Sequence, residues 1–327
     1  MKKCCFIIPY FGKLPSYFPL FLKSCSYNPD YNWMVFTDDN TNYDYPSNVD
    51  CFHLTFGKLQ EMVRAKFNFN ISLETPYKLC DFKPAYGYIF EEYTKEYRYW
   101  GHCDIDVVLG NLNVFLEHLF EQNYDKIFQL GHMTIYKNTF ENNRIFMNRY
   151  KNRNLYKEVF STPNICWFDE AWKDEFNINS IFLSMGKKIY SKDLSLNVVV
   201  GKNQFYRTEF VGNISDSCPH GYKVEKYKDA LYLWNKGNIE RYYLNNKNLI
   251  KESYLYFHFQ SRKMKMDLKC MNASVVKILA NNFELLEIEL PTVLTPDMFN
   301  RIKRHRLNLH VLSLKINRWK KKIINII

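Results

Sequence analysis

The sequence predicts an α/β protein in which a mixed sheet is flanked by helices. Three short apolar runs, at residues 4–8, 33–37 and 98–103, have the length and composition of buried strands, and each is followed by a proline or an aspartate. Helical stretches lie between them, and strands that alternate with helices form a parallel sheet. Hydrophobic residues make up 46% and aromatic residues 17% of the 327 positions, enough for a large core, which excludes disorder and low complexity.

Each element of the first 110 residues is marked by its apolar run and by the turn residues around it. Pro9 and Gly12 separate the first strand from the first helix, and Pro76 breaks the chain before the last helix. The expected strands are 4–8, 33–37, 49–55 and 98–103, and the expected helices are 16–25, 57–67 and 80–93.

The parallel pattern continues to about residue 150 and then fades. Up to that point we expect helices at 112–122 and 139–147 and strands at 126–130 and 133–136. Farther along, residues 231–234 and 239–244 flank Asn235-Lys236-Gly237-Asn238, which predicts a hairpin, and residues 253–259 form another aromatic strand.

Positive charge is concentrated at the C-terminal end. The formal net charge is +11, but residues 301–327 hold nine basic residues and no acidic one, so residues 1–300 hold 36 basic and 34 acidic residues. Because nucleic-acid-binding surfaces carry their basic excess where phosphate binds, the nearly neutral body argues against a nucleic-acid partner. A nucleic-acid-binding protein that uses aromatic side chains and the basic tail remains an alternative.

Cysteine usage and the N-terminus both point to the cytoplasm. The nine cysteines are odd in number and include no C-x-x-C pair, so we expect reduced thiols rather than a disulfide framework or a structural zinc site. The first apolar run ends at Pro9, too early for a signal peptide. No uncharged apolar run reaches the roughly 18 residues of a membrane-spanning helix.

Polar loops follow three of the predicted strands: Pro9-Tyr10-Phe11, Asp38-Asp39 and Asp104-x-Asp106. Since ligands of open α/β sheets collect at the carboxyl ends of parallel strands, these loops are expected to lie together. Asp104 and Asp106 form the only D-x-D of the chain, and such a pair can hold a hard divalent cation. Solvated or helix-capping aspartates are the alternative.

The chain resembles the donor-binding region of GT-A glycosyltransferases, which use nucleotide sugars. The resemblance is carried by KLCDFKPAYGY at 78–88 and by YWGHCDIDVVLG at 99–110. It implies a Rossmann-like GT-A mixed sheet, Asp81 and Lys83 at the donor, and Asp104 and Asp106 at Mn²⁺ or Mg²⁺. A Lys-Pro stands here where those families more usually have Arg.

The whole chain also looks like an uncharacterised bacterial family found with capsule and surface-polysaccharide genes, through FIIPYFGKLPSYF, WMVFTDD and the two segments above. This similarity implies a transferase of a hexose, galactose or glucose favoured, from a UDP-sugar to a glycan acceptor, which may be lipid-linked. We expect a GT-A domain over 1–260, with a nucleotide-binding half of about 1–110 and an acceptor half of about 111–260. A helical region over 261–327 would follow it.

The segment YLYFHFQSRK at 254–263 resembles the late His-Phe segment of glycogenin-like and lipopolysaccharide galactosyltransferases. The resemblance implies that His258 completes the metal site and that a following lysine reaches the diphosphate. Arg262 and Lys263 are therefore candidates for the donor phosphates. A histidine buried in the core and two ordinary surface cations are the alternatives.

Several further residues are candidates for the reaction. Asp169 or Glu170 could deprotonate the acceptor hydroxyl, as a carboxylate does in inverting GT-A enzymes, or could cap a helix N-terminus. His132 follows a strand and could line the acceptor side, although a structural role is the alternative. Tyr10 and its neighbours Pro9 and Phe11, with Asp38-Asp39, match where related folds hold the nucleobase and ribose.

The C-terminal tail has the pattern of a basic amphipathic helix. From Leu309 apolar residues recur at steps of three and four, with Trp319 among them and lysines and arginines beside them. Residues 309–327 are therefore predicted to contact an anionic membrane surface, placing the enzyme peripherally on the inner face of the cell membrane. Docking on the same chain or on another subunit is the alternative. A non-catalytic glycan-binding scaffold is a further alternative for the whole protein.

Overall fold

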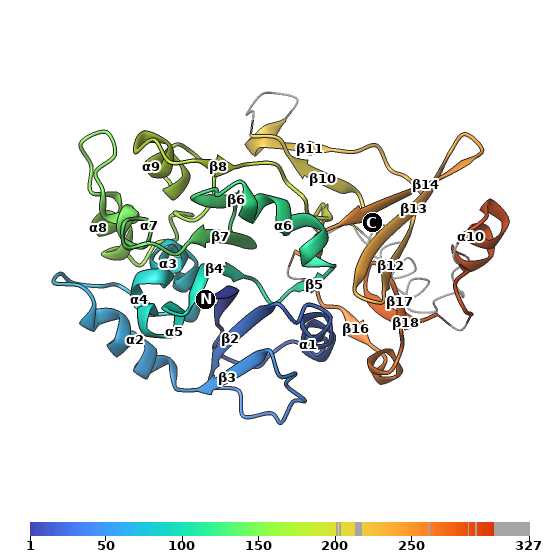
Figure 1. The fold of residues 1–327 in the computed structure, drawn as a ribbon, viewed down its shortest axis with the longest axis horizontal. Helices are drawn as coiled ribbons and strands as arrows, with labels where there is room; N and C mark the ends of the chain where they lie inside the picture. Colours follow the sequence, from blue (N-terminus) through green and yellow to red (C-terminus); the bar gives the residue numbers. More distant parts are fainter. Residues whose placement is uncertain are drawn as a thin grey trace, which may run out of the picture.

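The computed structural model describes residues 1–303 except 201, 203, 213–217, 261, 287 and 292. Its described part is a mixed α/β fold with two main sheets, seen side by side in Figure 1. The predicted amphipathic tail at 309–327 lies outside the described residues. Within the described residues, no helix is both long and apolar enough to cross a membrane.

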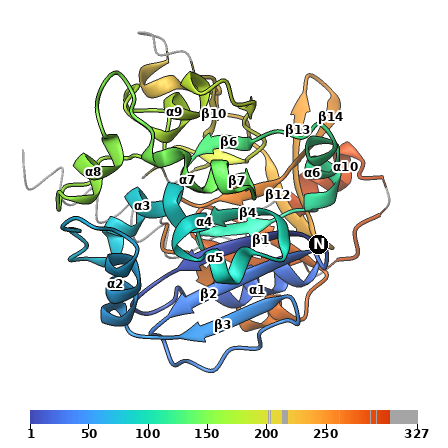
Figure 2. The same ribbon diagram turned by 60° about the vertical axis from the view of Figure 1, so that its left-hand side comes forward.

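The larger sheet has seven strands in the order β3-β2-β1-β4-β7-β6-β8, and most of this stack can be followed in Figure 2. The four strands from β3 to β4 are parallel, β7 runs antiparallel to both its neighbours, and β8 is parallel to β6. The strands are β1 (Lys2–Pro9), β2 (Tyr31–Thr37), β3 (Val49–His53), β4 (Tyr97–Cys103), β6 (Lys126–Leu130), β7 (Met133–Lys137) and β8 (Ile189–Tyr190). The predicted strands of the first 137 residues are thus confirmed, with small shifts at their ends.

Helices cover both faces of this sheet, because successive side chains of a strand point to opposite faces. On β1, Cys4, Phe6 and Ile8 pack in one core with α1 and α6, whereas Cys5 and Ile7 pack in the other core with α2, α8 and α9. The helices are α1 (Phe18–Ser26), α2 (Phe56–Ala65), α6 (Leu112–Glu121), α7 (Phe140–Arg144), α8 (Leu155–Phe160) and α9 (Ile178–Ser184), with η3 (Ile145–Met147) after α7.

The helix expected over 80–93 is broken into short pieces. Pro84 lies in its middle, and proline both lacks an amide donor and clashes with the preceding turn. The segment forms η1 (Pro76–Lys78), α3 (Leu79–Phe82), η2 (Lys83–Ala85), α4 (Tyr86–Ile89) and α5 (Glu91–Thr94). The break turns Lys83 away from a regular helix and toward the end of β4, where it meets Asp104.

The second sheet has six strands in the order β14-β13-β12-β17-β18-β16. The predicted hairpin is confirmed, with Lys236 and Gly237 at φ 45° and 80° in its turn, a conformation that glycine adopts readily. The strands are β12 (Leu231–Asn235), β13 (Asn238–Asn245), β14 (Asn248–Tyr254), β16 (Lys265–Met266), β17 (Val275–Ile278) and β18 (Asn282–Leu285). This sheet shares a core with Leu20 of α1 and with Tyr17, the residue before that helix.

The expectation of a helical region over 261–327 is wrong for its described part. The described residues after 260 form strands β16, β17 and β18, the short helix η5 (Leu268–Met271) and a single α-helix, α10 (Pro296–Lys303). Val275, Val276 and Ile278 are β-branched, which favours a strand. The sheet therefore continues across the expected boundary at residue 260. The strand expected at 253–259 also divides, since Tyr254 ends β14 and Tyr256 begins β15 (Tyr256–His258) in a different sheet.

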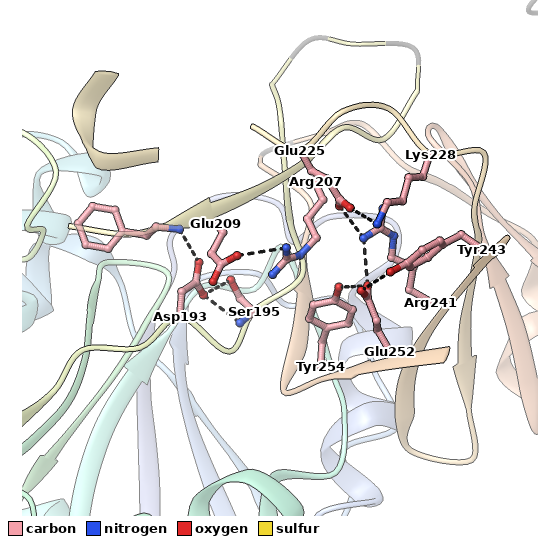
Figure 3. A network of polar contacts seen from close by, with 11 residues as sticks. Asp193, Ser195, Arg207, Glu209, Glu225, Lys228, Arg241, Tyr243, Glu252 and Tyr254 are labelled. Atoms are coloured by element: carbon pink, nitrogen blue, oxygen red, sulfur yellow. Dashed lines mark hydrogen bonds and ion pairs between the residues drawn. The ribbon is translucent and has the colours of Figure 1, made fainter. Parts of the chain in front are cut away.

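A network of ion pairs joins the second sheet to a smaller, three-stranded sheet. The smaller sheet consists of β9 (Asn197–Val198), β10 (Arg207–Phe210) and β11 (Tyr222–Val224), and Glu225 directly follows β11. Arg241 is 1% exposed, and its guanidinium lies 2.7 Å from the carboxylate of Glu225 and 3.0 Å from that of Glu252. Figure 3 draws both ion pairs. Tyr243 and Tyr254 also donate hydrogen bonds to Glu252. The turn η4 (Pro219–Gly221) precedes β11.

Candidate functional site

Three of the predicted loops do meet at one edge of the large sheet. Strands β1, β2 and β4 are parallel neighbours, so the loops at Tyr10, Asp38 and Asp104 follow the same ends of adjacent strands. In the loop after β1, the amides of Gly12 and Leu14 donate to Asp38 and Asp39 at 2.7 and 2.8 Å. Burial raises the pKa of Tyr10 in the same loop, and the carboxylates of Asp106 and Asp39 raise it further. The expected grouping of these loops is confirmed.

Asp104, Asp106 and His258 form a cluster whose ligand atoms all lie within 4.8 Å of one another. Strand pairing brings His258 there: β5 (Val107–Leu109) begins directly after Asp106 and pairs antiparallel with β15, which puts His258 opposite Val107. The amide of Phe259 also donates to the carbonyl of Asp106 at 2.9 Å. Two carboxylates and an imidazole are donors that can hold a divalent cation.

The electrostatics of the cluster match this donor set. Burial acts to lower the pKa of His258, but the carboxylate of Asp106, 3.5 Å from Nε2, and that of Asp104 raise it above its ordinary value. The imidazole therefore lies in a strongly negative environment, and a cation bound at the same place would be stabilised by the same carboxylates. The residues present fit a metal site of Asp104, Asp106 and His258.

Lys83 connects this cluster to a second pair of carboxylates. Its ammonium donates to Asp104 and to the carbonyl of Gly131, each at 2.8 Å, and lies 3.5 Å from Asp169. Burial acts to lower the pKa of Lys83, but Asp104 and Asp169 raise it well above its ordinary value, so the side chain stays charged. The lysine expected near the donor thus lies between Asp104 and Asp169.

Asp169 and Glu170 lie in a turn beside Gly131. A Cβ built on Gly131 would come 2.6 Å from Oε1 of Glu170 and would also collide with Asp169, so only glycine permits this approach. Burial raises the pKa of Asp169, against the effect of Lys83. Burial and the neighbouring Asp169 raise the pKa of Glu170. The pair therefore binds a proton more readily than two exposed carboxyl groups would.

The alternative in which Asp169 caps a helix is wrong. The residues from Phe168 to Phe176 form turns, bends and irregular backbone but no helix, and α9 begins only at Ile178, with Asn177 as its cap. The side chain of Asn177 accepts from the amides of Asn179 and Ser180. Since no helix starts at the pair, helix capping does not account for these two carboxylates.

Asp81 is buried and its carboxylate is engaged by the protein itself. Its Oδ2 accepts from the ammonium of Lys78 at 2.7 Å and from the amide of Cys166 at 2.9 Å, and its Oδ1 accepts from the amide of Phe168 at 3.0 Å. Its side chain is 0% exposed and that of Lys78 is 1% exposed. These contacts hold the segment that leads to Asp169. Sequence reasoning missed this ion pair, although the spacing of Lys78 and Asp81 could have indicated it.

His132 is buried beside the cluster of Asp104, Asp106 and His258 rather than at the surface. Its Nδ1 is 2.6 Å from the hydroxyl of Tyr256, and its ring centroid is 4.4 Å from that of His258. Its carbonyl accepts from the amide of Asp104 at 3.0 Å. Burial lowers its pKa well below the ordinary value, so the ring is neutral. The geometry places His132 next to His258, and contact with an acceptor stays a prediction.

The remaining candidates near the strand ends shape their own loops. Asp38 accepts from the amide of Gly12 at 2.7 Å, and Asp39 accepts from the amide of Leu14 at 2.8 Å, so both hold the loop that follows β1. Phe11 is buried against Phe56. Pro9 is the last residue of β1.

Arg262 and Lys263 differ in their surroundings. The guanidinium of Arg262 donates to the backbone carbonyls of Val199 and Lys202, whereas Lys263 is exposed. Both follow His258 within five residues, which keeps them near the end of β15. Contact of either residue with a phosphate stays a prediction.

Comparisons with known proteins give a structural similarity and a family. A crystal structure of the galactosyltransferase LgtC in complex with donor and acceptor sugar analogs is 10% identical and has a TM-score of 0.34, over 59% of this chain and 75% of that chain. No curated protein matches the chain. A family model described as a family of unknown function, DUF6625, matches residues 6–287. Because this match spans most of the chain, the protein belongs to the DUF6625 family.

Proposed function

We propose that this protein is a metal-dependent glycosyltransferase that moves a hexose from a UDP-sugar to a glycan acceptor in the synthesis of a capsular or other surface polysaccharide. The observation that carries the proposal is the Asp104–Asp106–His258 cluster, which Lys83 joins to the buried carboxylate of Asp169, the chain neighbour of the partly exposed Glu170. A cation site next to groups that bind a proton is what transfer from a nucleoside diphosphate requires. Galactose and glucose are the favoured hexoses.

In the proposed reaction Asp104, Asp106 and His258 would hold Mn²⁺ or Mg²⁺. When bound, the cation neutralises charge on the nucleoside diphosphate that leaves. Lys83 keeps Asp104 in place through its 2.8 Å hydrogen bond, and its positive charge lies within the same negative environment. The ring of His132 packs against that of His258, tilted by 33°, and this contact restricts the orientation of His258.

The same proposal gives Asp169 and Glu170 the role of general base. The acceptor hydroxyl oxygen forms a bond to the anomeric carbon, the bond from that carbon to the diphosphate oxygen breaks, and the hydroxyl proton passes to a carboxylate of the pair. Adjacent carboxyl groups do not both ionise readily, so one can be ionised while the other holds a proton. Direct attack of this kind inverts the anomeric configuration.

The nucleotide would bind at the loops that follow β1 and β2. Asp38 and Asp39 hold the backbone around Gly12 and Leu14, which fixes the loop that carries Tyr10. Arg262 and the exposed Lys263 would meet the diphosphate from the end of β15. The predicted tail at 309–327 would bring the enzyme to an anionic membrane surface that carries a lipid-linked acceptor.

A thermal-shift screen of nucleotide sugars with and without Mn²⁺ tests the proposal. UDP-galactose or UDP-glucose should raise the unfolding temperature when Mn²⁺ is present, since a ligand at 100 times its Kd stabilises a protein by about 2.7 kcal/mol. Without Mn²⁺ the shift should be much smaller. If no UDP- or GDP-sugar stabilises the protein under either condition, the donor assignment is wrong.

A further inference from the structure

Two tryptophans flank the turn that carries Asp169 and Glu170. Trp167 precedes the turn and Trp172 follows it, and their ring centroids lie 5.5 Å apart at 71°; we name them the indole pair. Both are partly exposed, whereas Trp33, Trp100 and Trp234 are fully buried. Among the tryptophans that the structure describes, only the indole pair can therefore meet a ligand.

The backbone holds Trp167 in an unusual position. Its φ is 56°, in the left-handed region that bulky residues rarely adopt. The amides on either side of it, those of Cys166 and Phe168, both donate to the buried carboxylate of Asp81. Phe168 is fully buried, so the chain is fixed on both sides while the indole between stays partly exposed. Backbone strain that is held in this way is common at ligand sites.

The indole pair and the two carboxylates lie on one turn that backbone hydrogen bonds hold. The amide of Glu170 donates to the carbonyl of Trp167 at 3.1 Å, and the amide of Ala171 donates to the carbonyl of Gln129 at 3.1 Å. The second bond ties the turn to β6, two residues before Gly131. A ligand that lies on the indole pair therefore contacts the same turn that carries Asp169 and Glu170.

Charged and aromatic groups complete the surface around the indole pair. The ammonium of Lys173 lies 4.6 Å from the ring centroid of Trp167, and the exposed ring of His220 lies 5.2 Å from that of Trp172. Lys173 is exposed and can donate to hydroxyl groups. The ammonium of Lys173 lies over the ring of Trp167 and the ring of His220 packs edge-to-face with Trp172, so polar groups adjoin both indoles.

We propose that the indole pair binds a pyranose ring of the glycan acceptor. The C–H bonds of a sugar ring carry partial positive charge and stack on the negative face of an indole, while the hydroxyl groups remain free for hydrogen bonds. A nucleic-acid base would also stack, but its phosphates would lie next to Asp169 and Glu170, which repel them. A neutral sugar brings no such charge. The proposal rests on the proposed function, because it takes the neighbouring carboxylates as the base for the acceptor hydroxyl.

Saturation-transfer NMR with lactose and maltose tests the proposal on the full-length protein in the presence of UDP and Mn²⁺. We expect saturation to reach the ring C–H protons of at least one disaccharide, and its Kd to rise about tenfold or more in Trp167→Ala and in Trp172→Ala. Trp172→Phe keeps an aromatic face and should recover most of the affinity. Phe140→Ala is the matched control, since Phe140 is a 68% exposed aromatic on α7, and it should change nothing.

Thermal unfolding of each variant shows whether an affinity change reflects lost folding, and Trp172→Phe keeps the test valid if an alanine variant fails to fold. An unchanged disaccharide Kd in both alanine variants would overturn the proposal, as would the absence of saturation transfer to either sugar in the wild-type protein. A parallel titration with UDP separates the two levels. If UDP and Mn²⁺ bind but the tryptophan variants keep the wild-type disaccharide Kd, the acceptor site is wrong and the donor site stands. If UDP does not bind, the proposed function itself fails.

Discussion

Replacing Asp81 with asparagine should destabilise the protein strongly, because Asp81 belongs to a buried ion pair. The side chains of Asp81 and Lys78 are 0% and 1% exposed, and their charged atoms lie 2.7 Å apart. Asp81→Asn removes the negative charge and leaves the buried ammonium of Lys78 with neutral acceptors, such as the carbonyls of Val159 and Asn164. Breaking a buried pair by removing one partner costs about 3–5 kcal/mol.

Equilibrium unfolding in urea measures this cost, and the chain offers a matched control. Lys58 and Glu61 form a pair with the same spacing at 2.9 Å, but their side chains are 64% and 67% exposed. Glu61→Gln should therefore cost about 0.5 kcal/mol or less. In a double-mutant cycle, Lys78→Met combined with Asp81→Asn should cost less than the sum of the two single changes.

The outcome also separates two roles for Asp81. If this carboxylate contacted the donor, as the resemblance implies, Asp81→Asn would weaken metal-dependent UDP binding and leave stability nearly unchanged. If Asp81 instead holds the segment that leads to Asp169, Asp81→Asn lowers the free energy of unfolding strongly, whatever its effect on UDP binding. A cost for Asp81→Asn as small as that for Glu61→Gln would refute the structural role.

Two further changes test other parts of the site. Gly131→Ala should cost about 1–3 kcal/mol in urea unfolding and sharply lower transfer, because the added methyl group meets Asp169 and Glu170; an alanine variant with normal stability and rate would contradict this packing. Lys126 is fully buried, and burial lowers its pKa to about 7. Between that value and its ordinary one near 10.5, the unfolded chain binds a proton that the folded chain does not, so stability rises with pH. Relative to Lys126→Met, the wild-type free energy of unfolding should gain about 2 kcal/mol from pH 7.5 to 9.5, and equal slopes would show that Lys126 is charged when folded.

The sequence predicts most of the large sheet, because its signals are local. Apolar runs that end at Pro9 and Asp38, with helices between them, specify parallel strands, and the shared edge of those strands follows from general rules of α/β sheets. Asp104 and Asp106 could be identified by their place at the end of a strand. These predictions need no knowledge of contacts between distant residues.

The parts that sequence reasoning missed depend on distant contacts or on one disruptive residue. The pairing of β15 with β5 brings residues about 150 positions apart together, so it was the resemblance, and not the pattern of residues, that pointed to His258. Pro84 breaks a helix that the apolar spacing predicts. Asp81 accepts hydrogen bonds from the amides of Cys166 and Phe168, and no local pattern predicts which backbone amides will donate to a buried carboxylate.

The most direct test of the central claim is calorimetric titration of UDP with and without Mn²⁺. Wild-type protein should bind UDP only when Mn²⁺ is present, and Asp104→Asn combined with Asp106→Asn should weaken this binding at least about 100-fold, since even changes to the partners of metal ligands cost 10- to 100-fold. Asp44→Asn combined with Asp50→Asn, two exposed aspartates outside the cluster, is the matched control and should bind normally. A UDP Kd that is the same with and without Mn²⁺, or that is unchanged when both carboxylates are removed, would contradict the claim that Asp104, Asp106 and His258 form a metal-dependent donor site.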